Sequence, residues 1–486
     1  MSKNRREFFT NVAAAGAGLL AAGKAGAAQH EQHGQQRPSG SQTVRVRPST
    51  SQSAPPAAEP AGDFLPVETP DVPKLPYKLV NGVKEFHLIA EPVKTEFLPP
   101  SRWAAARNVD AWGYNGSIPG PTIEVHQGDR VRIVFENRLP EMTTVHWHGL
   151  EVPMEMDGVP GLGQDPVKPG GRYVYEFTLH QHGTFFYHSH FPMQEMMGMI
   201  GLFIIHPKEP YRPNVDRDFA WILQEWAILP NNTVPNTLSM EFNWLTMNGK
   251  AGPAATPVLA KVGERVRLRF VNLGMDHHPM HLHGNTWVVT GTEGGRIPEA
   301  AWEPGNTEIV GVAQARMVEF EAKYAGDWML HCHLPHHMMN QMVSLVGPMS
   351  HVGHGVHTGM GMEEGMGIVR KGHALSEELG PSLGRGLGET ANRERATTVL
   401  VAQAQAQQQQ EHAPHGAEGS KLVPGFPQDM WMTMDDEVAK PETYGLRPTW
   451  TGAMMGMMTL VRVLPPELYD KIAELKKQQE QKAARG

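Results

Sequence analysis

The segment GDRVRIVFEN at residues 128–137 leads to HWHG at 146–149, and the related segment GERVRLRFVN at 263–272 leads to HLHG at 281–284. Charged and apolar residues alternate with a period of two in both segments, which is the pattern of a half-buried β-strand. Each strand leads into a pair of histidines, so the sequence predicts two copies of one β domain in tandem.

A second pair of matching segments lies downstream in each copy. The first copy has YHSH at 187–190, and the second has LHCH at 330–333. Apolar strands are expected to follow both, at 200–205 and 343–346. The pattern predicts an all-β chain of two antiparallel sandwiches, and the roughly 40 residues between the copies are too few for a third sandwich.

The first 27 residues are expected to form an export signal. Arg5 and Arg6 precede Phe8, and an Ala/Gly/Leu-rich segment ends at small residues near Ala27. Paired arginines of this kind are typical of the twin-arginine route, although an ordinary secretory signal also has a basic start. Either signal would send the protein to the periplasm or otherwise out of the cytoplasm.

Composition divides the rest of the chain into further segments. Low hydrophobicity predicts disordered linkers on both sides of the repeat, and helical patterning begins again at Pro466. The predicted segments are a signal at 1–27, a linker at 28–75, the first sandwich at 76–210, the second sandwich at 211–350, a Met/His/Gln-rich linker at 351–420 and a Met-rich C-terminal extension at 421–486.

The residue counts exclude several classes of protein. A single cysteine beside 25 histidines and 28 methionines rules out an internal disulfide, an iron–sulfur cluster and a thiolate zinc ribbon. The formal net charge of −8 gives no basic excess for binding nucleic acid. No run of 18 apolar residues follows the signal, so we expect no membrane span.

Four His-x-His pairs carry the candidate chemistry, at 146/148, 188/190, 281/283 and 331/333. Alternate residues of a strand point to one face, so each pair can present two imidazoles together. One such pair is often only a polar strand face. Four pairs at matching places in two repeats predict a cluster of metal ions.

The second copy has additional ligand types around its cysteine. Cys332 lies inside one histidine pair, His337 and Met342 follow at intervals of five residues, and His278 precedes His281 by three. Two imidazoles, a thiolate and a weak thioether form a blue-copper electron-transfer site. The first copy has Thr143, Ser189 and Gln194 at the corresponding positions and retains only Met199, so it is expected to lack this site.

These segments resemble the four copper motifs of the multicopper oxidases. The resemblance rests on HWHG, YHSH, HPMHLHG at 278–284 and HCHLPHHMMNQM at 331–342, and it covers roughly residues 85–350. It is closest to the two-domain, small-laccase-like branch with its blue copper in the second domain. Two features depart from the family pattern: Gln341 stands where the family has glycine, and His277 and His336 adjoin ligands.

The resemblance implies two tandem cupredoxin-like Greek-key β-sandwich domains that hold four copper ions and reduce dioxygen to water. It implies a homotrimer in which the cluster forms between subunits, and it makes Asp157 the carboxylate that supplies protons, although a structural turn aspartate is an alternative. The implied ligands are His278, Cys332, His337 and Met342 for type 1 copper, His146 and His281 for type 2, and His148, His188, His190, His283, His331 and His333 for type 3.

The reductant that delivers electrons to Cys332 and His337 stays open between Cu(I) and a phenol. Methionines near the type 1 residues and at 360–366 and 454–458 favour Cu(I), because thioethers bind Cu(I) in preference to Cu(II). The same methionines could be flexible core filler. The alternative functions are a copper nitrite reductase-like enzyme and a non-catalytic periplasmic copper-binding or resistance protein.

Overall fold

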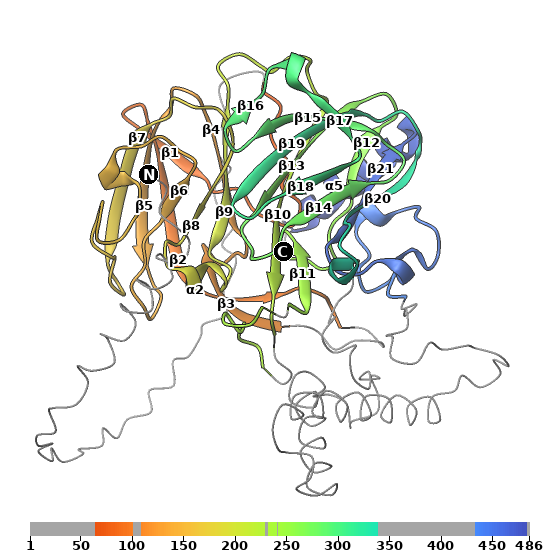
Figure 1. The fold of residues 1–486 in the computed structure, drawn as a ribbon. Helices are drawn as coiled ribbons and strands as arrows, with labels where there is room; N and C mark the ends of the chain where they lie inside the picture. The colour runs from red at the N-terminus through yellow and green to blue at the C-terminus, as the bar shows by residue number, and fades with distance from the viewer. Residues whose placement is uncertain (1–63, 101–107, 229–231, 241, 339–432, 484–486) are drawn as a thin grey trace, which may run out of the picture. The chain divides into compact units, whose positions relative to one another are not determined.

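The computed structural model describes residues 64–100, 108–228, 232–240, 242–338 and 433–483. These residues form an all-β chain of two sandwiches, which confirms the predicted fold class (Figure 1). The prediction of antiparallel sheets is wrong in part, because each of the four sheets also contains one parallel strand pair. The export signal, the linker at 351–420 and the predicted strand at 343–346 lie outside the described residues, as does most of the linker at 28–75. Among the described helices, none has the length and hydropathy needed to cross a membrane.

The first sandwich consists of two sheets. One has the strand order β1-β2-β5-β7, with β3 paired to β2, and the other has the order β4-β9-β8-β6. Its strands are β1 (Tyr77–Val80), β2 (Val83–Glu96), β3 (Asn108–Tyr114), β4 (Gly120–His126), β5 (Arg130–Asn137), β6 (His146–His148), β7 (Arg172–Thr178), β8 (Gly183–His188) and β9 (Ile200–His206). Its helical turns are η1 (Met154–Met156) and α2 (Pro192–Glu195).

The second sandwich repeats this plan. Its sheets have the orders β11-β10-β13-β19-β15-β16, with β17 on β15, and β12-β21-β20-β14-β18. Its strands are β10 (Arg217–Trp226), β11 (Trp244–Met247), β12 (Val258–Lys261), β13 (Arg265–Asn272), β14 (His278–Leu282), β15 (Trp287–Thr292), β16 (Gly295–Arg296), β17 (Glu303–Gly305), β18 (Thr307–Val310), β19 (Gln314–Glu321), β20 (Gly326–Cys332) and β21 (Met458–Leu464). Its helices are η2 (Glu299–Ala301), η3 (Pro335–Met338), η6 (Pro441–Thr443), η7 (Trp450–Ala453) and α5 (Pro466–Ala483).

The two repeated strands differ in burial. β5 alternates between buried and more exposed residues, as the sequence predicts for a half-buried strand. That prediction is wrong for β13, in which every residue after Arg265 is buried. The outer face of β13 packs against the first sandwich, and Arg269 on this face donates a hydrogen bond to Thr184 of β8 at 2.7 Å. Arg269 also donates a hydrogen bond to Asp218 on the neighbouring strand β10 of its own sandwich. A charged side chain can be buried there because its partners are buried with it.

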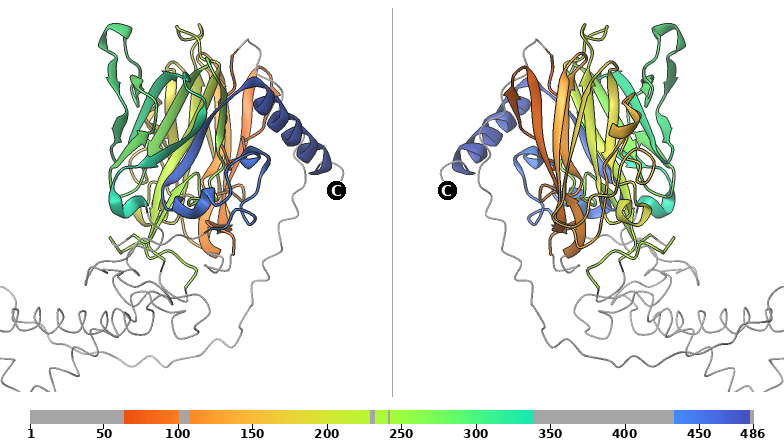
Figure 2. Two further views of the ribbon diagram at one scale, coloured as in Figure 1. Left: turned by 90° about the vertical axis from the view of Figure 1, so that its right-hand side faces the viewer. Right: turned by 90° about the vertical axis from the view of Figure 1, so that its left-hand side faces the viewer.

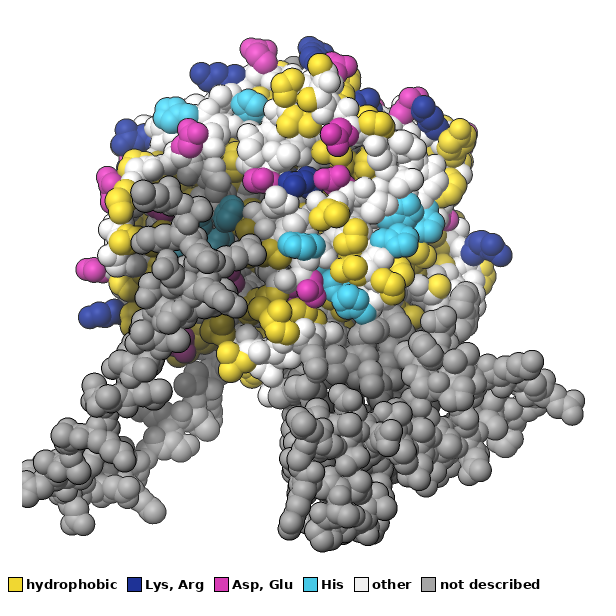
Figure 3. All heavy atoms as spheres, viewed as in Figure 1, with side chains coloured by type: hydrophobic (Ala, Val, Ile, Leu, Met, Phe, Trp, Pro, Cys, Tyr) yellow, Lys and Arg dark blue, Asp and Glu magenta, His cyan; other side chains and the backbone are white. Residues whose placement is uncertain are grey.

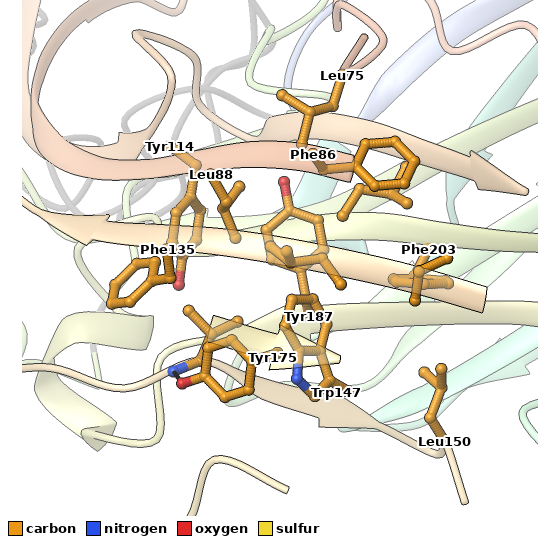
Figure 4. Packing of buried hydrophobic residues seen from close by; sticks show 14 of the residues in the cluster. Leu75, Phe86, Leu88, Tyr114, Phe135, Trp147, Leu150, Tyr175, Tyr187 and Phe203 are labelled. Atoms are coloured by element: carbon orange, nitrogen blue, oxygen red, sulfur yellow. Dashed lines mark hydrogen bonds between the residues drawn. The ribbon is translucent and has the colours of Figure 1, made fainter. Parts of the chain in front are cut away.

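The core of the first sandwich orients the first histidine pair. Trp147 is fully buried and packs edge-to-face on Tyr175 at a ring distance of 5.1 Å (Figure 4). His146 and His148 flank Trp147 on β6 and are only half-buried. Because successive residues of a strand point to opposite faces, burying Trp147 turns both imidazoles away from the core.

The C-terminal residues belong to the second sandwich. The sequence prediction assigns Met458–Leu464 to an extension separate from that domain, whereas the structure has β21 between β12 and β20, with every residue buried (Figures 1 and 2). Met458 pairs with His331, and Val463 pairs with Gly326. The helix predicted from Pro466 is confirmed as α5.

Strand β21 is the counterpart of β9 in the first sandwich. The orders β4-β9-β8-β6 and β12-β21-β20-β14 correspond strand by strand, and β9 and β21 are each parallel to one neighbour and antiparallel to the other. In this correspondence Ile200 pairs with His188 as Met458 pairs with His331. The second sandwich therefore completes its sheet with a strand from far along the chain.

Candidate metal centres

The predicted type 1 residues of the second sandwich converge on one point, and we call His278, Cys332 and His337 the Cys–His group. Sγ of Cys332 lies 3.8 Å from Nδ1 of His278 and 3.4 Å from Nδ1 of His337, and the two nitrogens are 3.1 Å apart. All three side chains are fully buried. They come from β14, the end of β20 and η3.

This spacing fits a single transition-metal ion. Metal bonds to imidazole nitrogen and thiolate sulfur are about 2.0 to 2.3 Å long, so donors on one ion lie roughly 3 to 4 Å apart. Burial raises the pKa of the Cys332 thiol to about 12 and lowers the pKa of His337 to about 3. Without metal the thiol is protonated and His337 is neutral, so metal binding would release the thiol proton.

The orientation of His278 depends on a buried carboxylate that the sequence prediction missed. Oε2 of Glu225 lies 3.0 Å from Nε2 of His278, and both side chains are fully inaccessible to solvent. Glu225 also accepts hydrogen bonds from the backbone amides of Met275 and Asp276. The sequence signal was an acidic residue near the end of a strand that is mostly apolar from Phe219 onward. The equivalent position of β2 is Pro92.

We expect Glu225→Gln to weaken metal binding by the Cys–His group by about 10-fold to 100-fold, since partners of metal-bound histidines have effects of this size. The amide keeps the shape of the side chain but loses the charge that favours an Nε2–H donor on His278. Copper titration followed by the blue absorption measures the change. Glu124→Gln in the first sandwich, a buried carboxylate paired with His206, is the matched control. Equal copper affinity in the wild type and Glu225→Gln would contradict this role.

In the first sandwich, a network of hydrogen-bonded polar side chains occupies the position equivalent to the Cys–His group. Thr143 and Ser189 have their hydroxyl oxygens 3.1 Å apart, and Ser189 donates to Oε1 of Gln194 at 2.7 Å. Nε2 of Gln194 in turn donates to the carbonyl of Met142 at 3.0 Å. This satisfied polar network contains no imidazole or thiolate.

A first histidine group lies at the edge of the first sandwich, on β6 and around the end of β8. Nδ1 of His148 lies 3.4 Å from Nε2 of His188, and the rings of His146 and His190 are 5.3 Å apart. Nδ1 of His188 donates to the carbonyl of Ser189 at 2.7 Å. The backbone thus fixes the tautomer and leaves Nε2 free to bind metal.

A second histidine group occupies the matching edge of the second sandwich, on β14 and around the end of β20. Nε2 of His283 lies 3.1 Å from Nε2 of His331, and the rings of His281 and His333 are 5.3 Å apart. Nδ1 of His331 donates to the carbonyl of Cys332, and Nδ1 of His281 donates to that of Asn306, both at 2.8 Å. The same tautomer control therefore operates in both groups.

Burial keeps one histidine of each group, His148 in the first and His331 in the second, neutral near pH 7. It lowers the pKa of His148 and of His331 to about 4, and the neighbouring imidazoles act in the same direction. Neutral imidazole is the form that binds a metal ion.

The two histidine groups are separate within one chain. Across the described ranges, every hydrogen bond and ring contact between histidines of the predicted cluster stays inside one group. His283 and His333 of the second group are exposed, and Figure 3 shows histidine side chains in separate patches on one face. The eight predicted cluster ligands thus form two separate groups in the described chain.

The remaining predicted residues are distributed as follows. The backbone carbonyl of Asp157 accepts a hydrogen bond from Nδ1 of His146 at 2.7 Å, and its carboxylate Oδ1 lies 3.4 Å from the same nitrogen. Asp276 and His336 can join His337 in a further cluster of ligand atoms. Met342 lies outside the described residues.

Comparison with known proteins agrees with this geometry. Two family models described as multicopper oxidase match residues 100–210 and 228–347. The copper resistance protein A homolog of Pseudomonas syringae pv. tomato is 47% identical over 113 residues, which are 23% of this chain and 19% of that protein. Laccase-2 of Botryotinia fuckeliana is 32% identical over 240 residues, which are 45% of this chain and 40% of that protein.

A solved structure is also similar. The blue copper oxidase from Nitrosomonas europaea has a TM-score of 0.48 and 28% identity, covering 53% of this chain and 81% of that chain. The chain spans between a fifth and two fifths of the length of the two curated relatives above. With two matched models, each over one sandwich, the chain belongs to the multicopper oxidase family and has a two-domain arrangement.

Proposed function

We propose that this protein oxidises a small reductant one electron at a time at a type 1 copper and reduces dioxygen to water at a trinuclear copper cluster. The observation that supports this proposal most directly is the separation of ligand types: one group is buried and contains Cys332 with two histidines, and two other groups contain only histidines. Bound copper would supply the redox chemistry, because thiolate and imidazole ligands suit electron transfer and imidazole suits oxygen binding. The proposed domains are residues 76–210 and 211–350, with β21 added to the second.

The proposed copper ligands come from the three groups. His278, Cys332 and His337 would hold the type 1 ion; His146 and His281 would hold the type 2 ion; and His148, His188, His190, His283, His331 and His333 would hold the type 3 pair. Cys332 is bonded in sequence to His331 and His333, which gives a short covalent path between the electron entry point and the cluster. Its burial keeps water from the thiolate.

We assign proton supply to Asp157. Its side chain is about one-third exposed and contacts His146, so its carboxylate can take up a proton from solvent beside the first histidine group. Its main chain also fixes the His146 ring, which is a second, structural role. The two roles can be separated, since a side-chain substitution leaves the carbonyl in place.

We propose a homotrimer in which the first group of one subunit meets the second group of the next. The exposed imidazoles of His283 and His333 and the separation of the two histidine groups in one chain support this arrangement. A head-to-tail contact that closes after three subunits repeats one such interface three times.

We propose Cu(I) as the reductant. A methionine cluster, consisting of Met329, Met338, Met454 and Met458, packs with Leu460 and Trp450. Met338 directly follows the ligand His337, so the cluster lies beside the electron entry point. Thioethers bind Cu(I) and hardly bind Cu(II), which suits a site that must release its oxidised product.

Oxygen uptake tests this proposal. With Cu(I) as reductant we expect one dioxygen consumed per four Cu(I), because four electrons are needed to form water. Met338→Leu with Met454→Leu preserves apolar volume and should raise the KM for Cu(I) about 10-fold, while leaving the rate with a phenolic dye unchanged. Negligible turnover of Cu(I) beside rapid turnover of the dye would assign the reductant as a phenol.

Two alternative functions receive less support. A nitrite reductase-like enzyme would have its type 1 site in the first domain, where this chain has Thr143, Ser189 and Gln194. A non-catalytic copper carrier would not need two matched histidine groups. Export through the twin-arginine signal, which lets a protein fold and acquire copper first, is consistent with the proposal, as is a role in copper homeostasis.

A further inference from the structure

We propose that Met457, and not Met342, is the axial ligand of the type 1 copper. This inference rests on the proposed function, because it presumes that copper binds the Cys–His group. Met342 follows His337 by five residues, which is the spacing that the motif predicts. Met457 follows it by 120 residues.

The first sandwich provides an internal reference for the position of the axial residue. There Met199 accepts a hydrogen bond at its carbonyl from the amide of Ser189 at 3.2 Å, and its own amide donates to the carbonyl of Gln194 at 3.3 Å. Ser189 and Gln194 are the counterparts of Cys332 and His337. Met199 is thus bonded through its backbone to the counterparts of both ligands.

Met457 makes the same two hydrogen bonds in the second sandwich. The amide of Cys332 donates to the carbonyl of Met457 at 3.0 Å, and the amide of Met457 donates to the carbonyl of His337 at 2.9 Å. Met457 is fully buried and belongs to the same core cluster as Cys332. The position occupied by Met199 in the first sandwich is therefore occupied by Met457.

The residue before the methionine agrees with this assignment. Gly198 and Gly456 precede the two methionines, and their φ angles are 109° and 68°. Positive φ is strained for residues with a side chain and is readily adopted by glycine. Gln341 precedes Met342, so the departure from the family pattern noted in the sequence disappears when Gly456 and Met457 fill these positions.

The strand that follows the methionine also corresponds. After Met199 comes β9, and after Met457 comes β21, which has the same neighbours and directions in its sheet. Residues 339–456 then form an insertion between the third and fourth ligands of one copper ion. The last part of the chain supplies a ligand and is not an accessory tail.

Electron paramagnetic resonance and redox titration of the copper-loaded full chain test this proposal. Met457→Gln should change the type 1 resonance and blue band, and Met457→Leu should raise the midpoint potential, because the axial ligand tunes both. Met342→Gln and Met342→Leu should leave spectrum and potential as in the wild type. Met199→Leu is the matched control, since Met199 is equally buried and bonded but has no copper group beside it.

The possible outcomes separate this inference from the proposed function. A spectral and potential shift in the Met342 variants with none in the Met457 variants would overturn the inference and leave the oxidase intact. A copper-loaded wild type without a blue band would overturn the proposed function instead. If the Met457 variants do not fold, Met342→Gln decides alone: an unchanged spectrum supports Met457, and a changed one refutes it.

Discussion

Replacing Cys332 by serine will abolish the blue absorption and lower oxidase activity at least about 1,000-fold, because no other thiolate can take its place. Cys332 is the chain's only cysteine. The substitution should leave the fold intact, since the first sandwich already holds a buried serine at the equivalent position 189. Visible absorption and oxygen uptake of the copper-loaded protein measure the effect.

Ser189→Ala is the matched control for this experiment. It removes a hydroxyl that donates to Gln194, so we expect it to destabilise the fold by about 1 kcal/mol. It should retain the blue band and most of the activity, because no copper is proposed beside it. A blue, active Cys332→Ser protein would show that electrons enter elsewhere.

Mixing two inactive variants will restore about a quarter of the wild-type activity if the cluster forms between subunits. His148→Ala damages the first histidine group, and His283→Ala damages the second. Each variant alone should fall below about 1% of the wild-type rate, because every interface then has one defective half. In randomly mixed trimers, half of the first groups and half of the second groups are intact, so one interface in four joins two intact halves.

The controls for mixing address assembly. Equal amounts of the variants are unfolded and refolded together, or coexpressed, so that the subunits of both variants assemble from one pool. Mixing His148→Ala with His146→Ala, which damages the same group, should restore nothing. Absence of any recovery from His148→Ala with His283→Ala, in trimers verified by mass to contain both chains, would mean that one chain closes its own cluster.

Much of the candidate site could be predicted from the sequence because its ligands lie in short local patterns. The pairs around Trp147 and Cys332 have a spacing of two, which on a strand places both side chains on one face. The first pair lies wholly on β6, whereas β20 ends at Cys332, directly before His333. The repeat then aligned Ser189 with Cys332 and so assigned the blue site to the second copy. Local spacing was sufficient for these features.

Features that depend on distant contacts could not be predicted in this way. Glu225 lies 53 positions before His278, and nothing in its local sequence indicates which side chain it contacts. The burial of β13 on both faces results from packing against the first sandwich, which strand periodicity alone does not reveal. In each case the deciding partner lies on another strand or in the other domain.

The sequence by itself determined the two-copy organisation, the ligand types and the presence of only one thiolate, because these follow from residue identity and short-range spacing. Only the tertiary structure showed that β21 completes the second sandwich and that Met457 forms backbone hydrogen bonds with Cys332 and His337. The physical reason is that sheet pairing is made by backbone hydrogen bonds between strands, and these bonds do not depend on how many residues separate the strands along the chain. Met342 and Met457 follow His337 at separations of 5 and 120 residues, and strand pairing brings Met457 beside Cys332.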